Sequence, residues 1–504
     1  MGKVLRKISV VLLALTAAIQ LAAVPASAES SAAPAYDGYL VKFSDSLRIP
    51  AAWGAQLDRV VPELYKFNSQ ALIKPLLDSG IVEYIEPDYY FQLCDTSEAG
   101  TTGAASGKGW AYDVMNAESA KTLGLDGSGV RIGIIDSGLD KANADLKNAT
   151  IAEGWNYKTK TTDTTDTFGH GTCVAEMIAG DDNSLGTTGI AAGATIVPLK
   201  CFSDQNDGLM SDIIQAVTDA AEKYDCDVIN MSLGISKSVI GATDLTSLDT
   251  AVAGAIDDGV MVVAAAGNKP TATINEDGIK VENTDNAILY PAACEGVIGV
   301  GSVDSSLAAV DTSRKNATVD VCAPGGRTGD MLVFSALSTS SSATVEKSGT
   351  SFAAPCVAAA AALAKQAYPG ASPAEVEALL EGRAEDLGDP GRDDKYGYGF
   401  VNLGEVFGSS WCSAVSGDDC TLHVGGFAIY AGGPEQSAGC TAAAAVYAQN
   451  GRLAAARTAS VTAGVTALSF DFTGVPDGAL AKVFFVDSSF TPVSEPAAAQ
   501  KVTK

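Results

Sequence analysis

The chain has 504 residues and carries 60 acidic against 33 basic side chains, which gives a formal net charge of −27 at pH 7. This charge argues against a nucleic-acid partner, because a phosphate backbone would repel it. Hydrophobic residues make up 47% of the chain, enough for a large core, and the length alone predicts more than one domain.

Residues 1–28 have the pattern of a secretory signal peptide. Basic residues open the chain, an apolar stretch covers 10–24, and Ala26-Ser27-Ala28 forms a small-residue cleavage site. A retained membrane anchor is the alternative. After removal of this segment we expect no membrane span, because no later stretch is apolar over a sufficient length. The sequence therefore predicts a secreted, extracellular protein.

Residues 29–94 are predicted to form a small α+β unit. Strands are expected over 39–43 and 82–88, with short helices over 57–64 and 70–77 between them. Residues 95–109 contain Gly, Ser, Thr and Ala without an apolar rhythm, so we expect a linker there.

Residues 110–407 are predicted to form an α/β domain, because apolar strands alternate with helical patterns. A helix is expected over 211–224, and Ser372-Pro373-Ala374-Glu375 has the form of a capping box. The expected strands are continuously apolar, as in a parallel sheet covered on both faces. They are 130–135, 195–199, 227–231, 260–265 and 297–303.

Residues 408–504 lack the helical periodicity of apolar residues seen in the preceding domain. We expect a β-sandwich here. Its predicted strands are 443–449, 457–462, 468–472 and 481–487.

The chain contains ten cysteines, and export is compatible with disulfides, whose pairing the sequence leaves open. Cys412 and Cys420 are close enough for a local loop disulfide.

His170 is the only histidine in the first 422 residues; His423 is the other. Imidazole titrates near neutral pH without perturbation, so His170 is the candidate base, with a structural histidine as the alternative. Asp136 ends an expected strand, and Ser351 precedes an alanine-rich helix expected over 352–367. The chain order Asp, His, Ser is one known order of a serine-nucleophile triad.

Ser351 is a weak nucleophile unless a base removes its proton. His170 can take that proton, and Asp136 can hold the imidazole in the required tautomer. The N–H groups at the start of the following helix would face a developing oxyanion. A plain helix N-cap is the alternative role for Ser351.

Two segments resemble the signatures of the subtilisin-like serine proteases. They are Gly169-His170-Gly171-Thr172 and Gly349-Thr350-Ser351-Phe352-Ala353-Ala354-Pro355, with Phe352 where methionine is usual. The resemblance covers roughly residues 36–407. It implies a parallel sheet flanked by helices, and peptide-bond hydrolysis through an acyl-enzyme with Asp136, His170 and Ser351 as the triad.

The resemblance also implies an oxyanion group and a substrate strand. Asn268 would donate its side-chain amide beside the N–H of Ser351, with a turn-forming Gly-Asn as the alternative. The edge strand pairing with substrate would contain Ser232, Leu233 and Gly234. The opposite wall of the primary specificity pocket would be formed by Ala265, Ala266 and Gly267.

The segment 82–88 is similar to the end of the family's propeptide, which implies an inhibitor-like propeptide over 29–94. Processing by the enzyme itself is expected between Gln92 and Gly107. The partners expected are a protein or peptide substrate and the chain's own propeptide as intramolecular inhibitor, for a monomer.

A structural Ca²⁺ site, without an organic cofactor, is implied as well. Asp145 lies nine residues after Asp136, and Asn183 thirteen after His170, the spacings of a calcium site of the family. Oxygen ligands suit this hard cation. An ordinary turn is the alternative. The ligands expected are Asp145, Asp181, Asn183, Leu185 and Thr187.

The sequence departs from the family's pattern at Cys173 and Cys356, where histidine is usual. The paired change predicts that the two thiols contact each other between two helices, with a disulfide as one form of that contact. Two independent small buried residues are the alternative.

The function predicted is that of a secreted, calcium-stabilised endopeptidase made as a self-processing proenzyme. The rivals are a catalytically inactive scaffold of the same fold and a processing protease dedicated to one partner protein. The C-terminal region resembles a β-sandwich module appended to secreted Gram-positive proteins. Residue preferences around the scissile bond are not evident from the sequence.

Overall fold

The structure, a computed structural model of the whole chain, describes most of the region between residues 36 and 408. The ranges are 36–44, 58–67, 82–94, 100–102, 109–183, 186–269, 273–274, 280–281, 285–327, 332–335 and 344–408, with seven strands beyond residue 410. The expected signal peptide and the helix expected over 70–77 lie outside the described residues. No helix within these ranges has both the length and the apolar character needed to cross a membrane.

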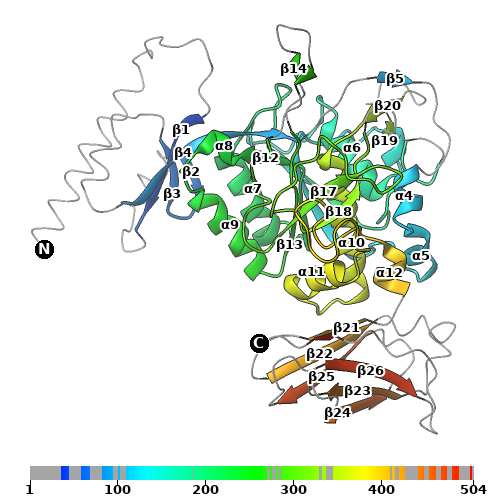
Figure 1. Cartoon of the computed structure of the whole chain (residues 1–504). Coiled ribbons are helices and arrows are strands. Elements are labelled where there is room, and N and C mark those ends of the chain that lie inside the picture. Colours follow the sequence, from blue (N-terminus) through cyan, green and yellow to red (C-terminus); the bar gives the residue numbers. More distant parts are fainter. Residues whose placement is uncertain are drawn as a thin grey trace, which may run out of the picture.

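A parallel sheet forms the centre of the structure (Figure 1), with the order β18-β17-β13-β11-β6-β9-β7 and with β8 also paired to β9. All of these pairs are parallel. The strands are β6 (Arg131–Asp136), β7 (Thr150–Ile151), β8 (Trp155–Asn156), β9 (Thr195–Lys200), β11 (Val228–Met231), β13 (Met261–Ala265), β17 (Val297–Val303) and β18 (Val321–Pro324).

Helices cover both faces of this sheet, and each face has its own hydrophobic core. The first core contains α6 (His170–Ala179), α10 (Thr350–Ala367) and α11 (Pro373–Gly382), and the second contains α7 (Met210–Glu222) and α9 (Thr246–Asp257). Along β13, Val263 enters the first core and Ala264 the second. Both faces are buried, which is why these strands are continuously apolar in sequence. The predicted α/β fold class is confirmed.

The capping box at the start of α11 is also confirmed. The Ser372 side chain accepts a hydrogen bond from the N–H of Glu375, and the Glu375 carboxylate accepts one from the N–H of Ser372 at 2.8 Å. Pro373 occupies the first turn, where its missing N–H costs no helical hydrogen bond.

The N-terminal unit is an antiparallel sheet of β1 (Tyr36–Phe43), β2 (Asp58–Val61), β3 (Leu64–Phe67) and β4 (Val82–Leu93). The helix expected over 57–64 is wrong, because this stretch forms the β2–β3 hairpin. Glu63 has φ 60° at the turn, and Val60 and Leu64 are buried beside aromatic neighbours. The β-branched and aromatic residues Val60, Val61, Tyr65 and Phe67 suit a strand, and their packing overrides the helical pattern.

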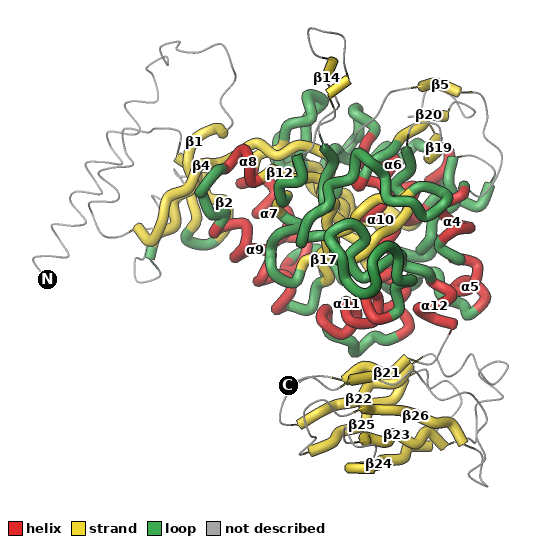
Figure 2. Tube along the Cα trace, viewed as in Figure 1, coloured by secondary structure: helices red, strands yellow, loops and turns green. Residues whose placement is uncertain are grey.

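β4 extends beyond its own sheet into the main body (Figure 2). It pairs antiparallel with β12 (Leu233–Ser236) on one side and with β10 (Gly208–Leu209) on the other. The last residues of the N-terminal unit therefore form a strand between two edges of the α/β domain.

Part of the predicted linker is ordered. β5 (Gly100–Thr102) pairs with β20 (Thr344–Lys347), which pairs in turn with β19 (Leu332–Ser335). The linker prediction for 95–109 is therefore wrong at these three residues, where backbone pairing with a distant segment replaces a local pattern. Residues 95–99 and 103–108 of that stretch lie outside the described residues.

Two antiparallel sheets make up the C-terminal region. One contains β21 (Trp411–Ala414), β22 (Asp419–Gly425) and β25 (Ala467–Thr473). The other contains β23 (Thr441–Tyr447), β24 (Leu453–Ser460), β26 (Leu480–Val486) and β27 (Gln500–Lys501). β21 and β22 were not expected from the sequence. Cys412 pairs in register with Val424, so Cys420 lies four residues away, about 13 Å along the strand. A Cys412–Cys420 disulfide does not fit this register.

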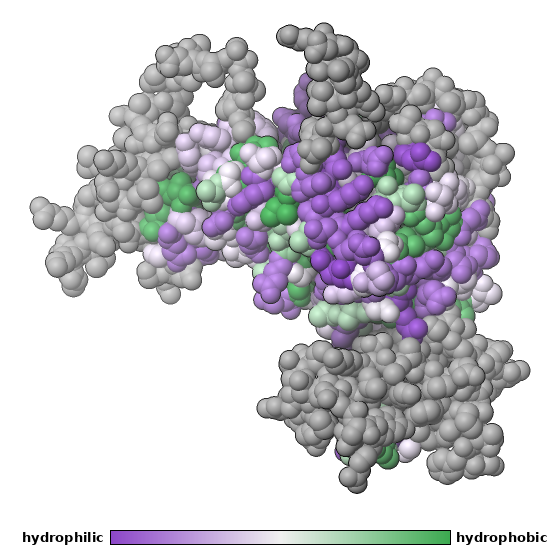
Figure 3. Space-filling model, in the orientation of Figure 1, coloured by the Kyte–Doolittle hydropathy of each residue, from purple (hydrophilic) through white to green (hydrophobic). Residues whose placement is uncertain are grey.

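The remaining elements are short. They are α4 (Trp110–Val114), α5 (Ala117–Thr122), the 3₁₀ turn η2 (Ala144–Leu146), α8 (Lys237–Ile240), β14 (Thr273–Ile274), β15 (Lys280–Val281), β16 (Leu289–Tyr290) and α12 (Leu403–Gly408). On the face drawn in Figure 3, hydrophilic residues cover most of the described surface, in keeping with the acidic composition.

Candidate active site

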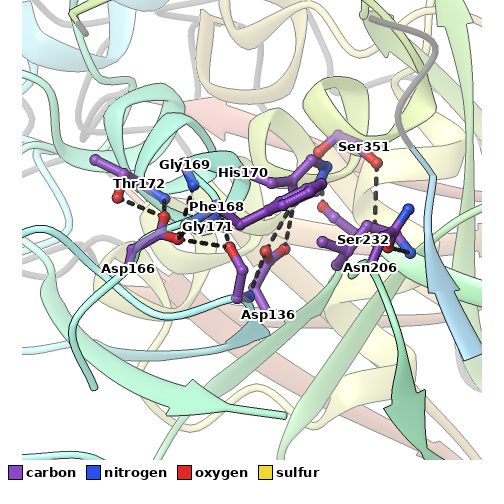
Figure 4. A network of polar contacts seen from close by, with 12 residues as sticks. Asp136, Asp166, Phe168, Gly169, His170, Gly171, Thr172, Asn206, Ser232 and Ser351 are labelled. Atoms are coloured by element: carbon purple, nitrogen blue, oxygen red, sulfur yellow. Dashed lines mark hydrogen bonds and ion pairs between the residues drawn. The ribbon is translucent and has the colours of Figure 1, made fainter. Parts of the chain in front are cut away.

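Asp136 and His170 meet at one edge of the central sheet (Figure 4). Asp136 is the last residue of β6 and His170 the first of α6. Nδ1 of His170 lies 2.8 and 2.9 Å from the two carboxylate oxygens of Asp136, and neither side chain is exposed to solvent. A buried carboxylate needs such partners, because it has lost its hydration. The contact fixes which edge of the imidazole faces away from Asp136.

The residues that follow this pair are tied together as well. The Ser137 hydroxyl donates to the Asp166 carboxylate at 3.0 Å and accepts the N–H of Gly171 at 2.9 Å. A Cβ on Gly171 would lie 2.3 Å from the carbonyl oxygen of Gly138, so glycine is required for α6 to approach β6 this closely. The strand end and the helix start are thus joined next to both functional candidates.

Asp166 organises the start of α6. Its Oδ1 accepts the N–H groups of Phe168 and Gly169 at 3.1 and 2.8 Å, and its Oδ2 accepts the N–H and the hydroxyl of Thr172 at 2.9 and 2.7 Å. These donors belong to the helix end that would otherwise lack acceptors. Sequence reasoning missed Asp166; an aspartate shortly before a helix start is the capping signal that could have found it.

Ser351 lies in the first turn of α10, on the side of the imidazole away from Asp136 (Figure 4). Its hydroxyl donates to the carbonyl oxygen of Ser232 at 3.1 Å, and the Ser232 hydroxyl donates back to the Ser351 carbonyl at 2.6 Å. A hydroxyl has one proton to donate, so the Ser351 hydroxyl must turn away from Ser232 before it can donate to His170. The ring of Phe352, which is fully buried, packs with its centroid 5.4 Å from that of the imidazole.

Asn268 is oriented from one side and donates on the other. Its Oδ1 accepts the N–H of Thr350 at 3.1 Å and the Thr350 hydroxyl at 3.2 Å. Its Nδ2 donates to the carbonyl oxygen of Cys94 at 2.6 Å. The resemblance implies that this amide stabilises an oxyanion. In the structure it donates instead to the carbonyl of Cys94, the residue just past the end of β4.

Residues 90–94 lie in the site as an extended strand. The N–H of Cys94 donates to the carbonyl of Ser232 at 3.0 Å, and Leu93 and Gln92 pair with Leu233 and Gly234 of β12. The opposite edge is β10, whose residues pair with Phe91 and Tyr90. Main-chain pairing of this kind is how an extended peptide adds to a sheet edge.

Leu289 occupies the space between the two expected walls of the pocket. A Cβ on Gly234 would lie 2.3 Å from Leu289 Cδ2, and a Cβ on Gly267 would lie 2.8 Å from the same atom. The side chain of Cys94 belongs to the same buried cluster as Ala265, Ala266 and Leu289. Leu289 therefore lies between Gly234 and Gly267, where the primary specificity pocket is expected, and sequence reasoning did not single it out.

Comparison with known sequences decides the family. Residues 127–399 match the profile of the subtilase family. The chain belongs to the subtilase family. It is 34% identical to subtilisin DY of Bacillus licheniformis over 297 residues, which is 58% of this chain and 96% of that protein.

Two further relatives agree. Subtilisin E of Bacillus subtilis is 34% identical over 291 residues, 57% of this chain and 68% of that protein. An alkaline protease of Shouchella clausii is 29% identical over 403 residues, 78% of this chain and 97% of that protein. The chain is accordingly a serine endopeptidase of the subtilase family, and its substrates are peptides.

Four of the five expected calcium ligands of this subtilase lie close together, while Leu185 is outside the described residues. The N–H of Thr187 donates to Oδ2 of Asp145 at 3.2 Å. The N–H of Asp181 donates to the Asp145 carbonyl oxygen at 2.7 Å. The N–H of Asn183 donates to the Asp181 carbonyl at 2.9 Å, and the Asn183 side chain reaches Asp145.

The residues fit a cation. Asp145 is fully buried, and its Oδ1 is among the described side-chain oxygens with no hydrogen-bond partner, as is Thr187 Oγ1. Burial raises the pKa of Asp145 to about 7. Hydrogen bonds, including one with the buried Glu176 side chain, act in the opposite direction and lower it. The described part of the chain holds no cluster of three or more His, Cys, Asp and Glu side chains suited to a metal. A site here would rely on amide and carbonyl oxygens beside Asp145.

Cys173 and Cys356 are carried by α6 and α10 and lie in the same buried core. Both are thiols, so the disulfide form of the predicted contact is not found. The Cys356 thiol donates to the carbonyl oxygen of Phe352, at 3.3 Å, within its own helix. Burial raises the pKa of Cys356.

Replacement of Asp166 tests how far the site depends on the network around α6. Asp166→Ala should lower kcat on the order of 10²-fold, because the helix that carries His170 loses the acceptor of its first N–H groups and shifts. Asp166→Asn, which keeps one acceptor oxygen, should lose less. The measurement is kcat and KM on a peptide substrate, with circular dichroism to verify folding.

Asp163→Ala is the matched control for this test. Asp163 lies in the same loop, but the hydrogen bonds to its carboxylate come from exposed Thr165. An Asp166→Ala enzyme with the kcat of the Asp163→Ala enzyme would contradict the expectation.

Proposed function

We propose that this subtilase hydrolyses peptide bonds through an acyl-enzyme on Ser351 and is made as a proenzyme that cuts itself after Cys94. The observation that carries the proposal is the hydrogen bond from Asn268 to the Cys94 carbonyl. It supports a substrate role for residues 90–94, since Cys94 directly follows a strand that pairs with β12 and β10.

Ser351 is proposed as the nucleophile. Its hydroxyl turns from the Ser232 carbonyl to His170, gives its proton to Nε2, and its oxygen bonds to the Cys94 carbonyl carbon. Asp136, held on Nδ1, stabilises the imidazolium that forms. The carbonyl oxygen becomes an oxyanion, which receives the Asn268 amide and the N–H of Ser351, an N–H without a helical acceptor at this position.

The acyl-enzyme forms when the carbon–nitrogen bond after Cys94 breaks. His170 returns the proton to the leaving nitrogen of Asp95, and water then attacks the ester with the same base removing its proton. Cys94 remains at the carboxyl end of the N-terminal piece. Since its strand pairing does not depend on the broken bond, this piece stays in the site as an inhibitor.

Two carboxylates of β4 support such an inhibitory role for residues 29–94. Asp88 is fully buried, and its two oxygens accept the N–H and hydroxyl of Ser211 at 2.8 and 2.7 Å, near the start of α7. Lys66 lies 2.9 Å from the same carboxylate. Glu86 accepts the N–H of Ser247 at 3.0 Å, at the start of α9. Each carboxyl group thus supplies an acceptor to an N–H at a helix start, where N–H groups lack a partner within the helix.

We propose export by the signal peptide at residues 1–28. A relative named as a minor extracellular protease of Bacillus subtilis supports this; it is 29% identical over 352 residues, 68% of this chain and 49% of that protein. The unit over 408–504 is proposed as a separate β-sandwich domain.

N-terminal sequencing of secreted enzyme tests the proposed processing. The mature protein should begin at Asp95, because Cys94 holds its carbonyl at Asn268. Ser351→Ala precursor should stay uncut when pure, and a trace of wild-type enzyme should cut it at the same bond. A different first residue, or maturation of pure Ser351→Ala protein, would contradict self-processing after Cys94.

A fluorophosphonate probe provides an independent check on the nucleophile. It should label Ser351 in processed protein and leave the Ser351→Ala variant unlabelled. Absence of labelling in processed wild-type protein would favour an inactive scaffold.

A preference for small residues before the scissile bond follows from Leu289. With this side chain between Gly234 and Gly267, peptides with Ala or Cys at that position should be cut much faster than peptides with Phe or Tyr. Leu289→Gly should reverse the order by opening the pocket. A peptide-library cleavage profile measures both, and an unchanged profile in the variant would refute the assignment. A dedicated processing protease would cut one sequence and leave the rest of the library intact.

Release of the N-terminal piece should depend on pH through Glu86. Burial raises its pKa from 4.5 to about 7, while hydrogen bonds from Ser247 oppose the rise and Asp249 adds to it. The docked state therefore retains a proton that the released state loses. Docking is favoured fully below about pH 4.5 and weakens as pH rises to about 7.

The measurement is the rate at which activity appears in processed wild-type enzyme between about pH 5 and 8. It should rise with pH, and Glu86→Gln should remove most of that dependence. Tighter inhibition at the higher pH would contradict the assignment.

Ca²⁺ is the proposed structural ion, held by Asp145, Asp181, Asn183, Leu185 and Thr187. When bound it supplies charge neutralisation at Asp145, which the unpartnered Oδ1 supports. Chelation should lower the melting temperature by several degrees at a starting concentration far above Kd, since an ion bound only to the folded state stabilises it. Asp145→Ala should abolish the response. A wild-type melting temperature that does not change on chelation would contradict the calcium site. The buried Asp145–Glu176 pair would then be neutralised by a proton.

A further inference from the structure

The β10 edge of the groove ends before it reaches Cys94. Gly208 pairs with Phe91 and Leu209 with Tyr90 in antiparallel register. Continued by two residues, this register would place Asn206 opposite Leu93. Asn206 instead has φ 56°, which removes its backbone from the ladder. A substrate N–H at the Leu93 position would then lack the backbone carbonyl that a continued ladder provides.

The Asn206 side chain takes the place of that carbonyl. Its Oδ1 accepts the N–H of Leu93 at 2.7 Å. Figure 4 shows Asn206 beside Ser232. The next N–H along, that of Cys94, donates to Ser232 on the opposite edge at 3.0 Å. Consecutive N–H groups of a strand point to opposite sides, so one groove edge satisfies each of them.

The turn around Asn206 is held by hydrogen bonds among its own residues. The N–H of Asn206 donates to the Ser203 carbonyl at 3.2 Å, and the N–H of Ser203 donates to the Asp207 carbonyl at 3.2 Å. The Ser203 hydroxyl also binds the Asp207 carboxylate. Asparagine is one of few residues besides glycine that tolerates this left-handed conformation. At position 206 the backbone thus leaves the strand pairing, and the side-chain oxygen accepts the N–H that the backbone carbonyl would otherwise accept.

We propose that Asn206 is a substrate-binding residue that recognises the backbone N–H of the second residue before the scissile bond. This rests on the proposed function, in which residues 90–94 occupy the groove as a substrate does. Recognition is independent of the side chain at that position, and it disfavours proline there, because proline has no N–H. The bond lies one residue from the carbonyl that Asn268 holds, so it also limits rotation of the scissile carbonyl.

A pair of peptides isolates this hydrogen bond. Both carry the sequence Tyr-Phe-Gln-Leu-Ala before a chromogenic leaving amine, and one has an N-methyl group on the leucine nitrogen. In processed wild-type enzyme, methylation should lower kcat/KM by the sum of a steric effect and the lost hydrogen bond. A typical neutral hydrogen bond contributes about two- to tenfold.

Three variants separate the two effects. Asn206→Gly keeps the left-handed turn and removes the acceptor, so its methylation penalty should be smaller than that of wild type by about two- to tenfold. Asn206→Asp keeps an acceptor oxygen and should keep the penalty. Gln205→Ala, at an exposed neighbour in the same turn, should match wild type. Thermal melting of each variant checks folding.

An Asn206→Gly enzyme with the full wild-type methylation penalty would overturn the assignment of Asn206 and leave the proposed function intact. A correctly processed wild-type enzyme that cuts neither peptide, nor any peptide of a library, would overturn both.

Discussion

The buried contact between Asp136 and His170 is the interaction on which the arrangement of the site depends. It forms because a parallel strand ends where a helix begins, and both side chains are withdrawn from water. A carboxylate in such a place is costly without hydrogen bonds, so the surrounding backbone is organised to supply them. Ser137, Gly171 and Asp166 extend that organisation to the residues directly after each partner.

The second constraint is the pairing of β4 with two edges of the α/β domain. Exposed edges are places where another strand can add, and here the chain's own N-terminal segment does so. The same pairing places the Cys94 carbonyl on Asn268, and in the proposed function it also keeps residues 90–94 in the groove as an inhibitor. In the proposed function, specificity follows from this pairing at two points. Leu289 limits the size of the side chain, and Asn206 recognises the backbone N–H before it.

Local sequence patterns predicted much of the fold correctly, and their failures have a common origin. The continuously apolar strands and the Ser372–Glu375 capping box act over a few residues, so their signals are readable. The prediction of a helix over 57–64 is wrong because packing of Val60 and Leu64 against other elements decides the conformation of this stretch. The short strand β5 was mistaken for linker because its partner, β20, lies more than 200 residues away in the sequence.

The sequence by itself determined the α/β class and the candidates Asp136, His170, Ser351 and Asn268, since each sits in a short segment with a recognisable pattern. Only the tertiary structure decided which residues meet them. Asn206 reaches Leu93 across 113 positions, and Asn268 reaches Cys94 across 174. Such contacts depend on how the strands are ordered and paired. A side chain's local neighbours do not record that order, so Leu289 and Asn206 became evident only in the folded chain.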